Sequence, residues 1–332
     1  MVVPLVPLSI LDVVPVSSGS SPARALRNTL ELARLAEDWG YRRYWVAEHH
    51  NTPALAACSP PVLVAWLAAA TSSMRIGSGG VMLPNHAPLV VAEQFGTLEA
   101  LHPGRIDLGI GRAPATDPVT AQALHRRDGS SCGDTYPDQI RELIGYFADS
   151  DGASVSAVPA AGNRPPVWLL GASESSARLA GSLGLPYSFA HHLGADQVVS
   201  AVRAYRAAFR PSSQLDQPVV MVAASVVCAD TDEQARWHAA AGDLLFLRSL
   251  GGNAGQFPSP QEAAEYPYTP NERQTIAKRM VKRIVGAPGT VREGVEKLVS
   301  ATEADELMIT TSVHDHADRL RSYKLLAETL TT

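Results

Sequence analysis

The sequence has only three cysteines among 332 residues, Cys58, Cys132 and Cys228, and they lie far apart. An odd number of distant cysteines excludes a disulfide framework and offers no metal-ligand spacing, so we expect no metal site. This cysteine usage favours a reducing, cytoplasmic compartment. An excess of positive charge is also lacking, because the net charge is -5 and no run of lysine or arginine stands out. A nucleic-acid partner is therefore not expected.

Long apolar runs are missing as well. No uninterrupted apolar stretch of ~18 residues appears, so we expect no membrane span. The apolar start, Met1 to Leu8, lacks a basic region and contains two prolines, which indicates the lead-in to a strand and not a signal peptide. The usual dinucleotide fingerprint is absent too, because the glycines at Gly77–Gly80 do not open a helix.

The chain does contain a regular alternation of short apolar stretches and longer helical patterns. The expected strands are 8–14, 44–50, 75–81, 105–112, 166–171, 187–190, 219–228 and 306–310. The expected helices are 22–39, 62–71, 88–102, 136–148, 173–183, 195–209, 232–250, 272–285, 290–301 and one at the C-terminus. Alternating strands and helices imply a parallel sheet, and eight units in one chain predict a closed (β/α)8 TIM barrel. An open doubly wound sheet is the alternative.

Two stretches between these elements carry little pattern. Residues 113–133 read as a long loop, and residues 251–270 are rich in Gly, Pro and Ser. We predict that 251–285 is a mobile lid, inserted at the C-terminal face of the barrel, whose closure excludes water. No composition break marks a second domain, so residues 1–332 are expected to form one.

Polar or glycine-rich clusters follow most of the expected strands, at the end where a TIM barrel carries its active site. They are Glu48-His49-His50, Gly79-Gly80, Gly111-Arg112, Gly171–Ser176, His191-His192 and Thr310–Ser312. Chance could place one such cluster there, but six of them predict a functional site. The alternative for His49 and His50 is a structural role, in which their ring nitrogens are hydrogen-bonded within the protein.

The segment Gly171–Ser176 leads from a strand through small hydroxylated residues into a helix. The free N–H groups and positive dipole end of a helix suit a phosphate, although Ser173 could simply cap the helix. Arg112 ends the preceding strand, so its guanidinium would complete a phosphate clamp. A surface salt bridge is the other interpretation of Arg112. Gly79-Gly80 would let the backbone lie flat against a planar ring, or merely relieve crowding inside the barrel.

Several motifs together resemble the bacterial-luciferase-like flavin-dependent monooxygenases, in particular a branch associated with natural-product tailoring such as antibiotic biosynthesis. They are Trp45–His50, Ile76–Pro84, Gly104–Arg112, Ser173–Ala177, Gly184–Pro186, and Asp305–Met308 with His314–His316. Each motif is weak singly, but their order and spacing are specific and cover nearly the full chain.

The resemblance implies a flavoprotein that binds reduced FMN, or in some branches the deazaflavin F420. By this resemblance, Arg112 and the helix start hold the phosphate, the Gly79–Gly80 peptide is cis against the flavin ring, and His49 is the catalytic histidine. The helix-start residues are Ser173, Glu174, Ser175 and Ser176, and Glu48 or His50 would fix the tautomer of His49. His191, His192 and Thr310 are expected at the substrate mouth. Gly111 stands where luciferase has a reactive cysteine, which argues against light emission.

The expected activity is a two-component monooxygenation, in which a separate NAD(P)H:flavin reductase supplies reduced FMN, and O2 oxygenates a small-molecule substrate. An F420-dependent oxidoreductase that transfers hydride is the alternative enzyme. A non-catalytic flavin-binding protein is the alternative of another class, and the Glu48-His49-His50 cluster argues against it. We expect a homodimer, because the helix at 62–71 is apolar nearly all round and needs a cover.

Overall fold

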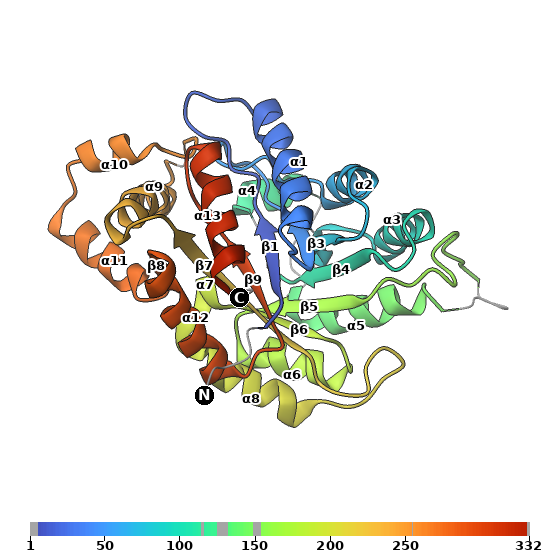
Figure 1. Ribbon diagram of the computed structural model, residues 1–332. Helices are drawn as coiled ribbons and strands as arrows, with labels where there is room; N and C mark the ends of the chain where they lie inside the picture. Colours follow the sequence, from blue (N-terminus) through green and yellow to red (C-terminus); the bar gives the residue numbers. More distant parts are fainter. Residues whose placement is uncertain (1–5, 114–115, 125–131, 149–153, 254, 331–332) are drawn as a thin grey trace.

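The computed structural model describes residues 6–113, 116–124, 132–148, 154–253 and 255–330. Its centre is a parallel sheet that closes on itself, with strand β9 pairing β1 through Ile309 and Ile10 (Figure 1). The barrel strands, in order around the ring, are β1 (Leu8–Asp12), β2 (Arg43–Val46), β3 (Arg75–Met82), β4 (Ile106–Gly111), β5 (Val167–Gly171), β6 (Tyr187–Ala190), β7 (Val220–Cys228) and β9 (Glu306–Thr310). The predicted (β/α)8 barrel is confirmed, and the open sheet is excluded.

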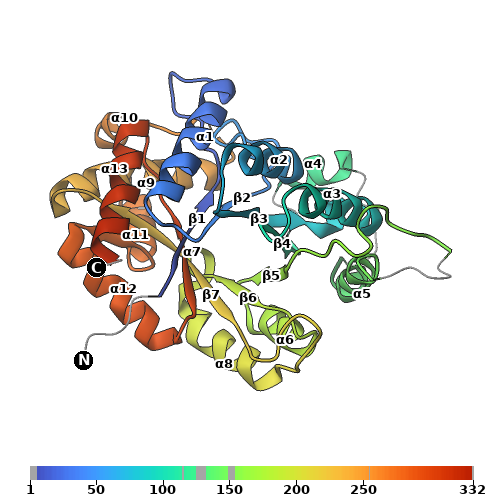
Figure 2. The same cartoon turned by 45° about the vertical axis from the view of Figure 1, so that its right-hand side comes forward.

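Helices cover the outside of the barrel, as Figures 1 and 2 show from two directions. They are α1 (Pro22–Asp38), α2 (Pro60–Ala70), α3 (Pro88–Leu101), α5 (Cys132–Gly145), α6 (Glu174–Ser182), α8 (Val198–Ala208), α9 (Asp232–Leu250), α12 (Pro288–Thr302) and α13 (His316–Leu330). Proline stands in the first turn of α1, α2, α3 and α12, where its missing N–H costs nothing. Because these start signals are local, the predicted helix bounds agree with the structure to within a few residues.

Some short elements were not predicted. Helix α4 (Pro118–Ala123) lies in the stretch expected to be a loop, where the Asp117 carboxylate accepts hydrogen bonds from the backbone N–H groups of Val119 and Thr120. Helix α10 (Pro260–Glu265) begins with a capping box between Ser259 and Glu262. Two one-turn elements, η1 (Leu83–Asn85) and α7 (His191–Gly194), were also missed, and the first residues of the predicted helix 195–209 form the short turn η2 (Ala195–Gln197) ahead of α8. All are too short to show a helical period.

The predicted helix 272–285 is wrong at its C-terminal end. Helix α11 (Pro270–Met280) stops early, and β8 (Ile284–Gly286) pairs in parallel with the last residues of β7. Strand β7 pairs with β9 only as far as Ser225, so its end projects beyond the barrel with an open edge. Pairing with β8 satisfies the backbone groups at the end of β7, which a continued helix would leave unpaired. The sequence around residues 281–285 cannot show this, because the partner strand is distant in the chain.

An ion network fills the barrel near the N-terminal ends of the strands. Arg43, whose side chain is 7% exposed, donates from Nη1 to Asp107 Oδ2 at 2.7 Å and from Nε to Glu306 Oε1 at 2.9 Å. Its guanidinium carbon also lies 5.0 Å from the centre of the Trp168 ring. Charged side chains therefore occupy this end of the barrel interior.

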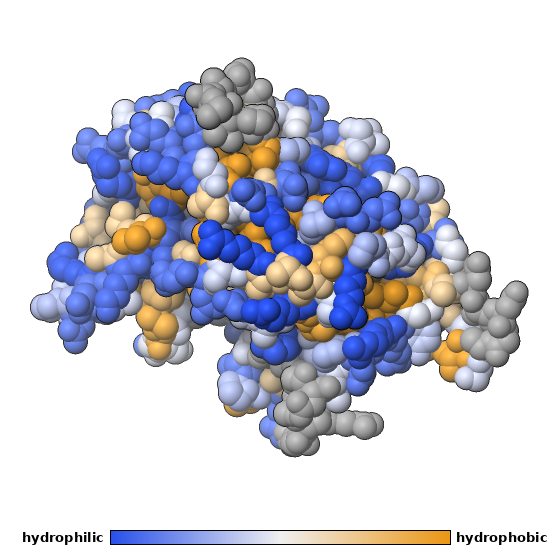
Figure 3. All heavy atoms as spheres, turned by 90° about the horizontal axis from the view of Figure 1, so that it is seen from below, coloured by the Kyte–Doolittle hydropathy of each residue, from blue (hydrophilic) through white to orange (hydrophobic). Residues whose placement is uncertain are grey.

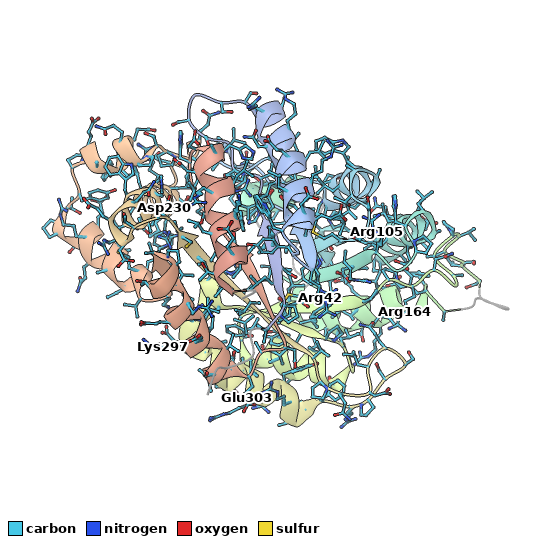
Figure 4. All side chains as sticks on the ribbon, in the orientation of Figure 1. Arg42, Arg105, Arg164, Asp230, Lys297 and Glu303 are labelled. Atoms are coloured by element: carbon cyan, nitrogen blue, oxygen red, sulfur yellow. The ribbon has the colours of Figure 1, made fainter. Side chains whose placement is uncertain are left out.

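Outside the barrel, Arg105 connects β4 to α2 (Figure 4). Its guanidinium donates to the Thr71 hydroxyl at 2.7 Å and to the Ala68 carbonyl at 3.2 Å. Viewed from below, the surface is mostly hydrophilic, and hydrophobic side chains appear only in smaller areas (Figure 3). In the part of the chain that the structure describes, no helix is long and apolar enough to cross a membrane.

Candidate active site

A cavity of about 950 Å³ opens at the C-terminal end of the barrel, and all six clusters singled out in the sequence contribute to its wall. The contributing members are Glu48, His49, Gly79, Gly111, Arg112, Gly171, Ala172, Ser173, Ser176, His192, Thr310 and Ser312. Five predicted site residues are not in this wall, namely His50, Gly80, Glu174, Ser175 and His191. The barrel closes strand ends from distant parts of the sequence around one space, as its geometry requires.

Glu48 is fully buried and holds the surrounding loops together. Its carboxylate accepts hydrogen bonds from the Met82 backbone N–H at 2.9 Å and the Asn85 side chain at 3.1 Å, and contacts the rings of His50 at 2.9 Å and His86 at 3.0 Å. Burial raises the pKa of Glu48, but the hydrogen bonds from His86 and His50 outweigh it, so the pKa lies below its usual value. Glu48 is therefore an ionised anchor for the segment after β3.

His49 lines the cavity, and its buried ring nitrogen Nδ1 has no partner among the described residues. Its backbone N–H donates to the Ala57 carbonyl at 2.7 Å, which fixes the chain. Burial lowers the pKa of His49, and the Glu48 carboxylate offsets this effect only in part. The ring is thus neutral at physiological pH and can accept a proton.

His192 also lines the cavity, whereas His191 does not. His192 Nδ1 contacts the Ala223 carbonyl at 3.0 Å, so it acts as a donor and its tautomer is set by the backbone. Burial lowers the pKa of both imidazoles. Thr310, only 8% exposed, completes this side of the wall.

The peptide between Gly79 and Gly80 is cis, as predicted. Both positions require glycine, because a Cβ on Gly79 would lie 2.7 Å from Leu11 Cδ1, and one on Gly80 would lie 2.8 Å from the Gly109 carbonyl oxygen. Gly79 thus presents bare backbone to the cavity while packing closely on β1.

Ser173 and Ser176, at the start of α6, line the same cavity as Arg112. The Ser173 hydroxyl accepts from the Ser176 N–H, while the Ser176 hydroxyl donates to the Ser173 carbonyl at 2.8 Å and contacts Tyr187 Oη at 3.0 Å. Burial raises the pKa of Tyr187 to about 12, so that hydroxyl keeps its proton. Ser173 therefore caps the helix, and Ser173 and Ser176 also line the cavity, whereas phosphate binding at this helix start stays a prediction.

Arg112 is exposed, and no described residue forms a hydrogen bond or an ion pair with its side chain. Arg112 therefore does not form the surface salt bridge considered from the sequence with any residue that the structure describes. Glu174 instead pairs with Arg178 at 3.2 Å on α6. A free guanidinium beside a helix N-terminus can bind an anion.

Three cations in the cavity wall were not predicted as site residues. Arg279, Lys282 and Arg283 come from α11 and the segment before β8, together with Phe246 from α9. These residues do not follow strands, so reading strand ends could not find them; the basic character of 272–285 was the only signal.

The insertion 251–285 is tied to the loop after β1. Phe257 exchanges backbone hydrogen bonds with Val16 and Ser18 at 2.8 and 2.7 Å, and the Ser18 hydroxyl donates to Glu262 at 2.8 Å. Helices α10 and α11 lie outside α9, at the left of Figure 1. A lid would thus move against these contacts, and its mobility stays a prediction.

A family model for luciferase-like monooxygenases matches residues 7–305. The chain belongs to this family. It is 43% identical over 318 residues to a luciferase-like monooxygenase of Escherichia coli K12, covering 96% of this chain and 95% of the relative. It is 32% identical over 331 residues to the N-acetyl-S-alkylcysteine monooxygenase of Bacillus subtilis, covering 98% of each. The crystal structure of apo-MsnO8 has a TM-score of 0.91 at 39% identity and covers 98% of both chains.

More distant solved structures share the fold alone. They include the oxygenating constituent of 3,6-diketocamphane monooxygenase in complex with FMN, at a TM-score of 0.71 and 18% identity. An F420-dependent secondary alcohol dehydrogenase has a TM-score of 0.70 and 14% identity. The predicted family is therefore confirmed and supports a monooxygenase, while both flavin and deazaflavin enzymes occur among proteins of this fold.

Proposed function

We propose that the protein is a flavin-dependent monooxygenase that takes reduced FMN from a separate NAD(P)H:flavin reductase and uses O2 to oxygenate a small organic substrate. The observation that carries the proposal is the cavity wall, to which Arg112, the start of α6 and His49 all contribute. Family membership supplies the class of reaction.

The residues present fit FMN. A phosphate needs charge and N–H donors, which Arg112 and the first turn of α6 provide. A planar ring needs flat backbone, and any side chain at Gly79 would collide with Leu11. The remaining wall is largely apolar, with Val13, Leu170 and Met308 suited to an aromatic ring and to the exclusion of water.

Reduced FMN, when bound, supplies the electrons with which O2 is activated. The protein contributes binding, orientation and proton handling. Arg112 and the α6 backbone hold the phosphate, and Gly79 positions the ring. The neutral His49 accepts or returns a proton at Nδ1, while Glu48 keeps the neighbouring loop in place through His50 and His86.

The substrate and biological role are proposed more broadly. A natural-product tailoring role is proposed on the resemblance of the sequence motifs alone. N-acetyl-S-alkylcysteines are a first class to test, because a relative at 32% identity is named for them. Hydride transfer with F420 is the second candidate, because an exposed Arg112 would equally hold the F420 phosphate.

The test is turnover with reduced FMN and isotopically labelled O2, alongside the mass and absorption spectrum of any molecule released on denaturation. Incorporation of one labelled oxygen atom into the substrate is expected. Consumption of reduced F420 without oxygen uptake would replace the proposal with the hydride-transfer alternative. Tight FMN binding without product from a broad substrate panel would favour the non-catalytic alternative.

A further inference from the structure

The cavity wall carries cations from two separate parts of the chain. Among the described residues that line it, the cations are Arg112, Arg279, Lys282 and Arg283, and the only carboxylate is Glu48. Glu48 is already engaged by two imidazoles and does not appear among the partners of these cations. Arg279 and Arg283 share one carboxylate, that of Asp243, which does not line the cavity, so this pair of cations can bind a further anion.

Arg283 is the most unusual member of this group. Its side chain is 3% exposed, and Nη1 donates to Asp243 Oδ1 at 2.7 Å. Its Nε and Nη2 are buried, and no described residue accepts a hydrogen bond from either. A buried donor left unsatisfied carries a desolvation cost that hydrogen bonding normally removes. Burial lowers the pKa of Arg283, and the Asp243 carboxylate opposes this shift.

The two free nitrogens of Arg283 form one edge of the guanidinium. The N–H bonds of Nε and Nη2 are parallel along that edge, so a carboxylate can accept one hydrogen bond from each with its two oxygens. Gly242 and Ser312 lie beside it, because a Cβ on Gly242 would be 3.8 Å from Nη2 and 3.4 Å from Ser312 Cβ. Arg283 itself lines the cavity, so this buried edge lies at the cavity wall.

Asp243 cannot neutralise the whole group. Its Oδ1 accepts from both Arg279 and Arg283, so one carboxylate oxygen serves two guanidinium groups. Arg279 also lies over the Phe246 ring, 4.8 Å from its centre. Lys282 pairs at 2.8 Å with Asp196, whose side chain is 81% exposed and thus largely solvated.

The position of Arg283 separates it from the phosphate clamp. Arg112 follows β4, whereas Arg283 precedes β8, in the connection between β7 and β9. In the closed ring, β9 and β7 lie across from β4 and not beside it. One phosphate bound at Arg112 and α6 therefore leaves the Arg283 edge to another group.

We propose that Arg283, with Arg279 beside it, binds a carboxylate of the substrate, so that the enzyme oxygenates small organic acids with an apolar body. This inference rests on the proposed function, since it assigns the cofactor phosphate to the opposite side of the cavity. The apolar wall would hold the body of the substrate near His49 while the acid end is fixed at Arg283.

The test compares 3-phenylpropanoate with 3-phenylpropan-1-ol, which differ in the acid group, by calorimetric titration of the FMN-loaded and FMN-free protein. The wild-type protein should bind the acid roughly 10- to 150-fold more tightly than the alcohol. Arg283→Gln should abolish this preference. Arg164→Gln is the matched control, because Arg164 also has an unpartnered Nε but lies outside the cavity wall, near the start of β5 (Figure 4).

Equal affinity of the wild-type protein for acid and alcohol would overturn the inference. An Arg283→Gln variant that keeps the preference but binds FMN weakly would also overturn it, because the Arg283 edge would then hold the cofactor phosphate.

If Arg283→Gln does not fold, Arg283→Lys is tested instead, because lysine keeps the charge but lacks the two parallel N–H donors. An undiminished preference for the acid in that variant would refute paired hydrogen bonding. Failure of the wild-type protein to bind FMN would reject the proposed function while leaving the acid preference measurable.

Discussion

The Glu48 carboxylate and the His86 imidazole lie 3.0 Å apart, although 38 positions separate them in the chain. This contact, together with the one from His50, keeps Glu48 ionised and fixed. Glu48 and His49 are therefore neighbours with different tasks. Glu48 connects loops at the barrel mouth, whereas His49 lines the cavity and its buried Nδ1 has no partner among the described residues.

Replacement of Arg112 tests the phosphate clamp. Arg112→Ala should weaken FMN binding roughly 10- to 150-fold and leave riboflavin binding unchanged, because a hydrogen bond to a charged group contributes about 1.5–3 kcal/mol. Fluorescence titration with both ligands measures the difference. Arg178→Ala is the control, since Arg178 is exposed on α6 and pairs with Glu174 outside the cavity wall. Equal losses for FMN and riboflavin would rule out a phosphate contact.

The fold could be predicted from the sequence because its signals are local and repeated. Apolar stretches alternate with helices opened by proline, and eight such units close in only one common way. The closed barrel brings together the residues that follow each strand, so several residues of the cavity wall could be predicted from the sequence. This is why His49, Arg112 and Ser176 could be placed at one cavity before the structure was known.

Residues that reach the cavity from elsewhere could not be predicted. Arg279 and Arg283 belong to the insertion, and His86, which contacts Glu48 without lining the cavity, follows the short η1 turn, so none of them directly follows a barrel strand. Strand β8 was missed because it is a strand only through its pairing with the projecting end of β7. In each case the determining partner is distant in sequence.

The buried histidines predict that acid destabilises the protein. Burial lowers the pKa of His49, His191 and His192 below the 6.5 of a free imidazole. Below that pH the unfolded chain binds more protons than the folded one, so the free energy of unfolding falls as pH falls. The melting temperature should therefore drop between about pH 7 and about pH 5, before most carboxylates titrate.

His192→Gln should reduce this pH dependence, because it removes one of the shifted groups while an amide can still donate to the Ala223 carbonyl. Thermal unfolding at a series of pH values measures the slope in both proteins. A variant with the same slope as the wild-type protein would show that His192 does not contribute.

The exposed apolar face of α2 carries the prediction of a homodimer. Leu63, Val64 and Leu67 are buried against the barrel, whereas Val62 is 67% and Trp66 is 38% exposed on the outer side. Trp66→Glu would place a charge in any interface there. Light scattering at micromolar concentration should show a dimer for the wild-type protein and a monomer for this variant. Val281→Glu is the control, because Val281 is 88% exposed and distant in sequence; a monomeric wild-type protein would refute the prediction.

His49 should affect catalysis far more than binding or stability. Its ring is neutral and its Nδ1 has no described partner, so removing it breaks no side-chain hydrogen bond that holds the fold. Since general acid–base assistance typically contributes ~10²–10⁴-fold, His49→Ala should lower the rate of product formation by about that factor. FMN affinity and melting temperature should stay close to the wild-type values. His50→Ala is the contrasting variant, because it removes a partner of the buried Glu48 and should lower the melting temperature first. A His49→Ala enzyme that oxygenates as fast as wild type would show that the ring transfers no proton in the rate-limiting step.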